Sequence, residues 1–200
     1  MAEIRIPIAK LLRRKKSFTA LEAEKLGVSR QQLSIYCKQG KIERLGRGLY
    51  SPPGLEVNPY LDIEMLVKKQ SDFVVCLLSA LRIHNFTTQL PHSLWIAIPH
   101  GARLPKLEFG TISCIRLTPA PYDFGVEIHD LYGVKVKVYS AAKTVADCFK
   151  FRNKVGIDVA MEALREGHRL KLFTISELMA AAKVCRVEKI ITPYAESLFS

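Results

Sequence analysis

The sequence predicts an α+β fold made of two parts, and three observations lead to that prediction. Residues 17–51 have the pattern of two short helices followed by a hairpin, and a break rich in proline and glycine follows at residues 51–54. Beyond the break, short stretches of alternating apolar and polar residues predict strands. From residue 140 onward the apolar period becomes helical. We therefore expect domains at residues 1–54 and 55–200, the second with a mostly antiparallel sheet followed by C-terminal helices.

The N-terminal part is predicted to contain a helix over residues 7–16 and then two helices joined by the turn Gly27-Val28-Ser29. Glycine suits the left-handed position that ends a helix, and serine is a preferred cap for the next one. In that second helix, Leu33, Tyr36 and Cys37 fall at positions i, i+3 and i+4. Such spacing places all three side chains on one face, which we expect to be buried.

A hairpin is predicted directly after these helices. Residues 41–45 and 49–51 flank the tripeptide Gly46-Arg47-Gly48, whose two glycines suit a tight turn that directs the arginine outward. Two helices around a glycine turn, followed by a basic hairpin, form the pattern of a winged helix-turn-helix. The competing interpretation is a small helical subdomain with solvated basic residues.

The face of the second helix opposite the predicted core carries side chains that hydrogen-bond base edges and phosphates in a major groove. The basic hairpin and the end of the first helix would add phosphate contacts. The predicted DNA-binding residues are Arg30, Gln31, Gln32, Ser34, Ile35 and Lys38 on the helix, Lys41, Arg44 and Arg47 on the hairpin, and Arg13 and Arg14 before them.

The charge distribution supports a nucleic-acid-binding N-terminal part. The whole chain has a formal net charge of +11, and residues 1–54 hold 12 Lys and Arg against 4 Asp and Glu, a net charge of +8. Residues 55–200 hold the remaining 18 basic residues against 15 acidic ones, a net charge of only +3. A basic excess confined to one segment is typical of a DNA-binding module attached to another domain.

The second part is predicted to open with a helix over residues 60–70, followed by a buried strand at 94–98 and a half-exposed strand at 111–117. Residues 126–129 and 134–138 alternate and predict a hairpin. Ser140 is placed to cap the helix that follows, and breaks are expected at Gly167-His168 and Thr174.

Within the helix after Ser140, Asp147 has apolar neighbours and Lys143 stands four residues before it. Two arrangements fit this spacing. Asp147 is either a buried, paired carboxylate or a solvent-facing partner of Lys143.

The sequence lacks the local motifs of metal, cofactor and nucleophile sites, so we expect no metal, no cofactor and no enzymatic activity. The five cysteines are odd in number and far apart, which predicts free thiols. The five histidines form no HExxH and no pair four residues apart on a helix, and no glycine-rich phosphate loop or G-x-S-x-G motif occurs. The alternative is a metal-dependent nuclease using Asp130 and Glu127 near Lys135 or Lys137, against which stands the ordinary interpretation of solvated strand charges.

The composition is that of a cytoplasmic protein. Charged residues make up 24% of the chain, and no apolar run approaches the roughly 20 residues that span a bilayer. The first 16 residues lack the apolar core and cleavage site of a secretory signal.

The chain resembles the AbiEi-type antitoxins of type IV toxin–antitoxin systems, a family that also includes stand-alone transcriptional regulators. The stretches that resemble it are LGVSRQQLSIYCKQGKIERLGRGLYSPPG, SALRIHNFTTQLPHSLWIAIPHGAR, VEIHDLYGVKVKVYS and AAKTVADCFKFRNKVGIDVAMEALRE. The last departs from the family pattern, because Lys143-Thr144 stands where an Arg-Thr pair is usual and Ala141-Ala142 replaces a start similar to Pro-Glu.

The resemblance implies two roles. The N-terminal part would bind double-stranded DNA at inverted repeats in the promoter of its own operon and repress it. A homodimer on the DNA would match such paired half-sites. The second domain would counteract a nucleotidyltransferase-like toxin indirectly, without a stable complex. A stand-alone regulator with no toxin partner is the alternative that this family also contains.

Overall fold

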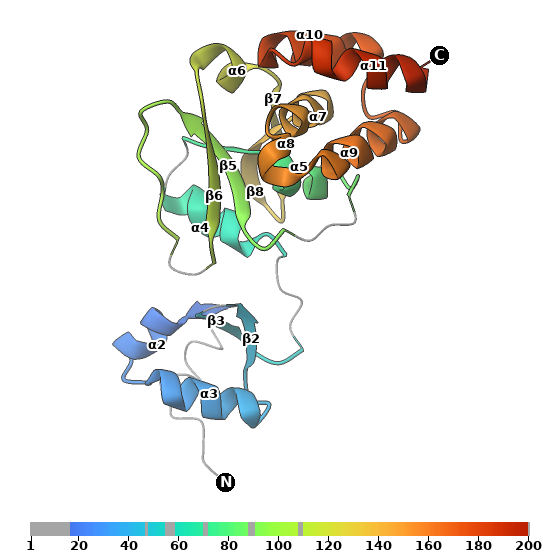
Figure 1. Cartoon of the computed structure of the whole chain (residues 1–200). Helices are drawn as coiled ribbons and strands as arrows, with labels where there is room; N and C mark the ends of the chain where they lie inside the picture. The colour runs from blue at the N-terminus through green and yellow to red at the C-terminus, as the bar shows by residue number, and fades with distance from the viewer. Residues whose placement is uncertain are drawn as a thin grey trace. The chain divides into compact units, whose positions relative to one another are not determined.

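The computed structural model describes residues 17–46, 48–54, 59–69, 72–87, 91–107 and 110–199. These residues form an α+β structure with one antiparallel and one mixed sheet, as Figure 1 shows. They divide into two compact units. The first comprises the described residues up to Met65 with 106–107 and 110, and the second comprises the others. The predicted helix over residues 7–16 lies outside the described residues.

The first unit consists of two short helices and a small sheet. Its elements are β1 (Phe18–Thr19), α2 (Ala20–Lys25), α3 (Arg30–Lys38), β2 (Glu43–Gly46) and β3 (Leu49–Ser51). The three strands form an antiparallel sheet in the order β1-β3-β2, so the predicted hairpin is present.

The core of the first unit lies where α3 packs against the sheet. Leu33 is 0% exposed and Tyr36 is 5% exposed, while Cys37 is half-buried. The rings of Phe18 and Tyr50, paired across β1 and β3, stack with centroids 5.8 Å apart. The predicted buried face of the second helix is therefore confirmed.

The second unit combines a five-stranded sheet with a helical group. After α4 (Leu61–Lys69), where the two units divide, the chain forms β4 (Val74–Val75), α5 (Leu77–Ile83), β5 (Leu94–Pro99), β6 (Ile112–Leu117), α6 (Pro119–Asp123), β7 (Val126–Leu131) and β8 (Val134–Tyr139). The helices α7 (Ala141–Lys150), α8 (Arg152–Val155), α9 (Ile157–Arg169), α10 (Ile175–Cys185) and α11 (Glu188–Phe199) follow.

The large sheet is mixed, so the prediction of a mostly antiparallel sheet was wrong for it. Its order is β6-β5-β4-β8-β7, in which β5 pairs with β6 and β4 with β8 in parallel, while the other two pairs are antiparallel. Alternation of apolar residues shows which face of a strand is buried but not its direction. The 100–111 connection is long enough for β6 to return parallel to β5, which a short hairpin turn does not allow.

One predicted helix break was also wrong. Helix α9 continues through Gly167 to Arg169, although the sequence suggested an end at Gly167-His168. A Cβ atom at Gly167 would lie 2.3 Å from a ring carbon of Phe173, so the glycine allows close packing inside the helix. The predicted break at Thr174 is confirmed, since this residue caps α10.

Helix α7 lies at the centre of the second unit and carries a buried ion pair. Residues 141–149 are all buried, and Ser140 caps the helix as predicted. The ammonium of Lys143 donates to the carboxylate of Asp147 at 2.5 Å, and both side chains are 0% exposed. Of the two arrangements that the spacing allowed, the structure shows the buried pair.

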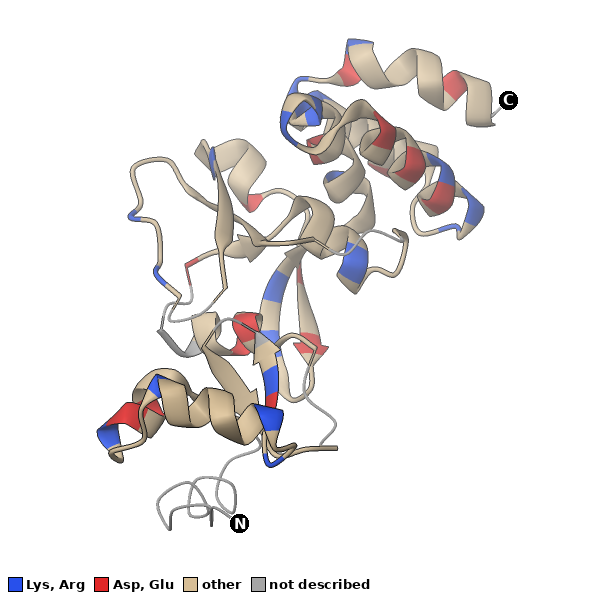
Figure 2. Ribbon diagram, turned by 60° about the horizontal axis from the view of Figure 1, so that its bottom comes forward, with Lys and Arg blue, Asp and Glu red and all other residues tan. Residues whose placement is uncertain are grey.

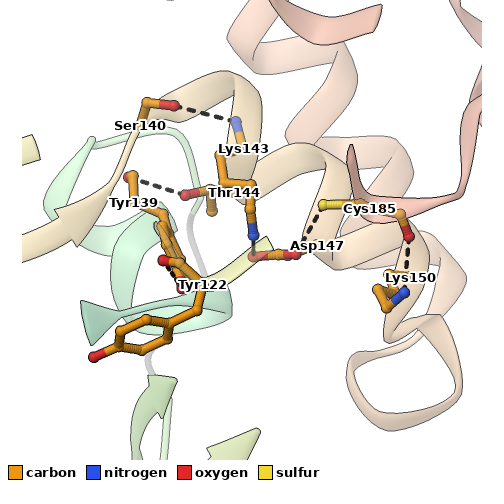
Figure 3. A network of polar contacts seen from close by, with 8 residues as sticks. All are labelled: Tyr122, Tyr139, Ser140, Lys143, Thr144, Asp147, Lys150 and Cys185. Carbon is orange, nitrogen blue, oxygen red and sulfur yellow. Dashed lines mark hydrogen bonds and ion pairs between the residues drawn. The ribbon is translucent and has the colours of Figure 1, made fainter. Parts of the chain in front are cut away.

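Further contacts surround this pair, as Figure 3 shows. The Lys143 ammonium lies 4.1 Å from the centroid of the Tyr139 ring, and the Cys185 thiol of α10 donates to Asp147 at 3.3 Å. Burial raises the pKa of Asp147, and the Lys143 ammonium opposes that rise. The Tyr139 hydroxyl in turn donates to the carbonyl of Tyr122 at 2.9 Å. The pair thus joins β8, α7 and α10.

We predict that Lys143→Ala destabilises the protein by roughly 3–5 kcal/mol, because it leaves a buried carboxylate without its partner. Urea unfolding followed by circular dichroism measures this loss. The exposed residue Lys183 of α10 provides the control, and Lys183→Ala should change the free energy of unfolding by no more than about 0.5 kcal/mol. A loss for Lys143→Ala as small as the control's would contradict the structural role of the pair.

Candidate nucleic-acid interface

The turn between α2 and α3 is built as the sequence predicts. Gly27 has φ of 78°, the left-handed conformation that ends a helix. Ser29 then caps α3: its hydroxyl accepts the Gln32 amide at 3.3 Å, and its own amide donates to the Gln32 side chain at 3.0 Å. This reciprocal capping box fixes the start of α3.

Helix α3 presents one continuous exposed stripe. Gln31, Ser34, Ile35 and Lys38 are all exposed, and their spacing of i, i+3, i+4 and i+7 places them on the face opposite the buried Leu33. Ile35 is 48% exposed near the middle of the stripe. The stripe therefore combines an amide, a hydroxyl, an apolar side chain and a cation, which together can contact base edges, thymine methyl groups and phosphates.

Two predicted contact residues of α3 also have local roles. Arg30 forms an ion pair with Glu24 of α2, with 2.8 Å between its Nε and the carboxylate. The side chain of Gln32 is half-buried and serves the capping box. Arg30 thus links α3 to α2, while Gln32 fixes the start of α3. The sequence alone did not indicate the part played by Glu24.

The hairpin adds basic residues beside α3. Arg44 is exposed on β2 and pairs with Tyr50 of β3, and the Lys41 ammonium lies 5.9 Å from the centroid of the Tyr36 ring. Burial raises the pKa of Cys37 in α3, and the nearby Arg44 opposes that rise. Figure 2 shows the basic residues of α3 and of the hairpin.

The remaining predicted contacts, Arg13, Arg14 and Arg47, lie outside the described residues. In all, seven of the 12 Lys and Arg residues in 1–54 fall there. The described residues 17–54 contain five basic and three acidic side chains. Most of the basic excess thus belongs to residues outside the described part of the chain. Within the described residues, α3 has the exposed stripe of Gln31, Ser34, Ile35 and Lys38.

In the second unit, the carboxylates suggested for a nuclease do not converge. Glu127 and Asp130 are three residues apart on β7, so their side chains point to opposite faces of the strand. Asp130 accepts the amide of Gly133 at 2.7 Å and so closes the hairpin turn. No helix within the described part of the chain is long and apolar enough to cross a membrane.

A helix pair with an exposed polar stripe, followed by a basic hairpin, is an arrangement typical of transcriptional regulators. The family model described as "Transcriptional regulator, AbiEi antitoxin" matches residues 7–53. This match confirms the resemblance for the N-terminal segment, the first of the four stretches that resemble the family.

The chain was also compared with curated proteins and with solved structures. No curated protein matches the chain. Among solved structures, the chain is similar to the crystal structure of the RV2827C protein from Mycobacterium tuberculosis, with 13% sequence identity and a TM-score of 0.45. That similarity covers 88% of this chain and 79% of the other.

We predict that Ser29→Ala destabilises the first unit by about 1 kcal/mol, because it removes the cap of α3. Ser34→Ala is the matched control, since it removes the same hydroxyl from an exposed position within the same helix and should cost no more than about 0.5 kcal/mol. Hydrogen exchange of the α3 amides measures both effects locally. Equal effects of the two substitutions would show that the capping box does not stabilise the helix.

Proposed function

We propose that the chain is a transcriptional autorepressor whose first unit is a winged helix-turn-helix. In this proposal α3 is the recognition helix, which enters the major groove, and the β2–β3 hairpin is the wing, which contacts the phosphate backbone. The observation on which the proposal chiefly rests is the stripe of Gln31, Ser34, Ile35 and Lys38, exposed on a helix whose opposite face is buried. The family match over residues 7–53 supports it.

The residues of this interface have different expected roles. Gln31 and Ser34 would hydrogen-bond base edges, and Ile35 would pack against thymine methyl groups. Lys38, Lys41, Arg44 and Arg47 would contact phosphates, which supply affinity without reading sequence. Arg13 and Arg14 would add to the phosphate contacts, while Arg30 and Gln32 would hold the helix in its orientation.

The proposed operator is a pair of inverted repeats in the promoter of the chain's own operon. Two copies of the chain would bind as a homodimer on the DNA, because paired half-sites match the two-fold symmetry of a dimer. Binding of its own promoter would make the level of the protein self-limiting.

We propose that the second unit is the antitoxin part. It would counteract a nucleotidyltransferase-like toxin indirectly, without forming a stable complex and without catalysis. The opposite orientations of Glu127 and Asp130 on β7 support a role other than that of a nuclease. A stand-alone regulator with the same DNA-binding unit would lack only this second activity.

We predict that the full chain binds a fluorescent duplex from the region upstream of its own gene more tightly than a shuffled duplex of equal composition. Fluorescence anisotropy at several salt concentrations measures both affinities. Lys38→Ala should weaken binding to both duplexes alike and lower the magnitude of the salt slope by about 1, since it removes one phosphate contact. Gln31→Ala should instead reduce the preference for the upstream duplex by about 1–3 kcal/mol.

Lys183→Ala, an exposed change in the second unit, is the charge-matched control and should leave both affinities unchanged. Absence of binding to the upstream duplex below about 0.15 M salt would contradict the repressor proposal, because phosphate contacts dominate at low salt. Unchanged specificity in Gln31→Ala would instead contradict the assignment of α3 as the recognition helix.

A further inference from the structure

We propose that the second unit binds one divalent transition-metal ion of the Zn²⁺ type through His84, Glu127 and His129. One ligand atom from each of these side chains lies within 4.8 Å of the other two. Imidazole nitrogens and a carboxylate oxygen are a ligand set that proteins use for Zn²⁺ with three protein ligands and a fourth open position.

The three residues come from two elements that are far apart in the sequence. His84 caps the C-terminal end of α5, while Glu127 and His129 lie two residues apart on β7 and so point to the same face of the strand. The sequence contains no local metal motif because Glu127 lies 43 positions after His84. The contacts of His84, at the end of α5, with Tyr139 of β8 and His129 of β7 bring the three together.

A hydrogen bond to the backbone sets the tautomer of His84. Its Nε2 lies 2.7 Å from the carbonyl oxygen of Tyr139. A carbonyl can only accept, so Nε2 carries the proton and Nδ1 has the lone pair that a metal needs. A hydrogen bond from the other ring nitrogen to a backbone carbonyl is the usual support of a histidine ligand, since it fixes both tautomer and ring orientation.

The other two ligands are already close to each other and accessible. The Nε2 of His129 lies 3.1 Å from a carboxylate oxygen of Glu127, and the side chains are 28% and 50% exposed. The rings of His84 and His129 meet edge to face, with centroids 5.1 Å apart. Ligands of a tetrahedral ion with bonds of about 2.0–2.1 Å lie about 3.4 Å apart, so small side-chain rotations bring the three atoms to binding distance.

An ion at this position would link two parts of the second unit. It would join the end of α5 to β7, the strand at one edge of the five-stranded sheet. The same Tyr139 carbonyl that orients His84 also accepts the hydroxyl of Thr144 at 3.2 Å, so the site is anchored to the start of α7. Metal binding would therefore stabilise the hairpin against α5, with solvent or a further ligand at the fourth position.

The test is a titration of the full chain, purified without a histidine tag, with ZnCl₂ in an isothermal calorimeter. We expect one saturable site per chain. Titration with Co²⁺ should give the visible absorption of a low-symmetry, four- or five-coordinate ion. Glu127→Gln and His129→Gln should each weaken Zn²⁺ binding by roughly 100-fold or more, since the loss of even an outer-shell partner costs about 10- to 100-fold.

His100→Gln is the control, because His100 is an exposed histidine of the same unit outside the cluster and its loss should leave the affinity unchanged. His84→Gln completes the series. If that variant fails to fold, the two substitutions on the exposed edge strand still decide the question. Unchanged Zn²⁺ affinity in both Glu127→Gln and His129→Gln, or the absence of a saturable site, would overturn the proposal.

Discussion

The second unit depends on one buried ion pair in helix α7, between the ammonium of Lys143 and the carboxylate of Asp147. The elements packed around α7 can bury these two charges only while they remain paired. Removing two charges from water costs several kcal/mol per ion, and the cost is recovered only with close geometry and further hydrogen bonds. Lys143 and Asp147 meet these conditions, with 2.5 Å between them, an aromatic ring beside the ammonium and a thiol donating to the carboxylate. Removal of either partner would leave an uncompensated charge among β8, α7 and α10.

Tyr139 connects this pair to the rest of the second unit. Its ring contacts the Lys143 ammonium, its hydroxyl donates to the Tyr122 carbonyl, and its own carbonyl accepts from Thr144 and from His84. The histidine that heads the proposed metal site is thus oriented by the residue that also contacts the buried pair. Tyr139, at the end of β8, therefore contacts both the buried pair and the histidine beside the edge strand β7.

Local features of the fold were predictable from the sequence, and long-range ones were not. Gly27, Ser29 and Ser140 act through their own backbone and the next turn of helix, so their roles follow from residue type and spacing. The exposed stripe of α3 follows from its period in the same way. The directions of the strands depend on how distant segments pair, and no alternation pattern contains that information.

The candidate sites show the same division. The exposed face of α3 that carries the predicted DNA contacts follows from helical spacing. The ion pair of Arg30 with Glu24 joins two helices and could not be predicted in that way. The grouping of His84 with Glu127 and His129 arises from packing between a helix end and a strand. The pair of Lys143 with Asp147 was predictable only in part. The spacing of the two residues allowed them to pair, but only the tertiary structure shows that the pair is buried.

In the proposed function, α3 reads DNA from the major groove. Methylation interference on the upstream region, with the full chain as the protein, tests it directly, since N7 of guanine lies in that groove. If α3 lies in the major groove of each half-site, methylation at guanine N7 will block binding at two clusters of positions related by inverted symmetry. Interference confined to minor-groove positions, or none at any guanine within the protected region, would contradict it.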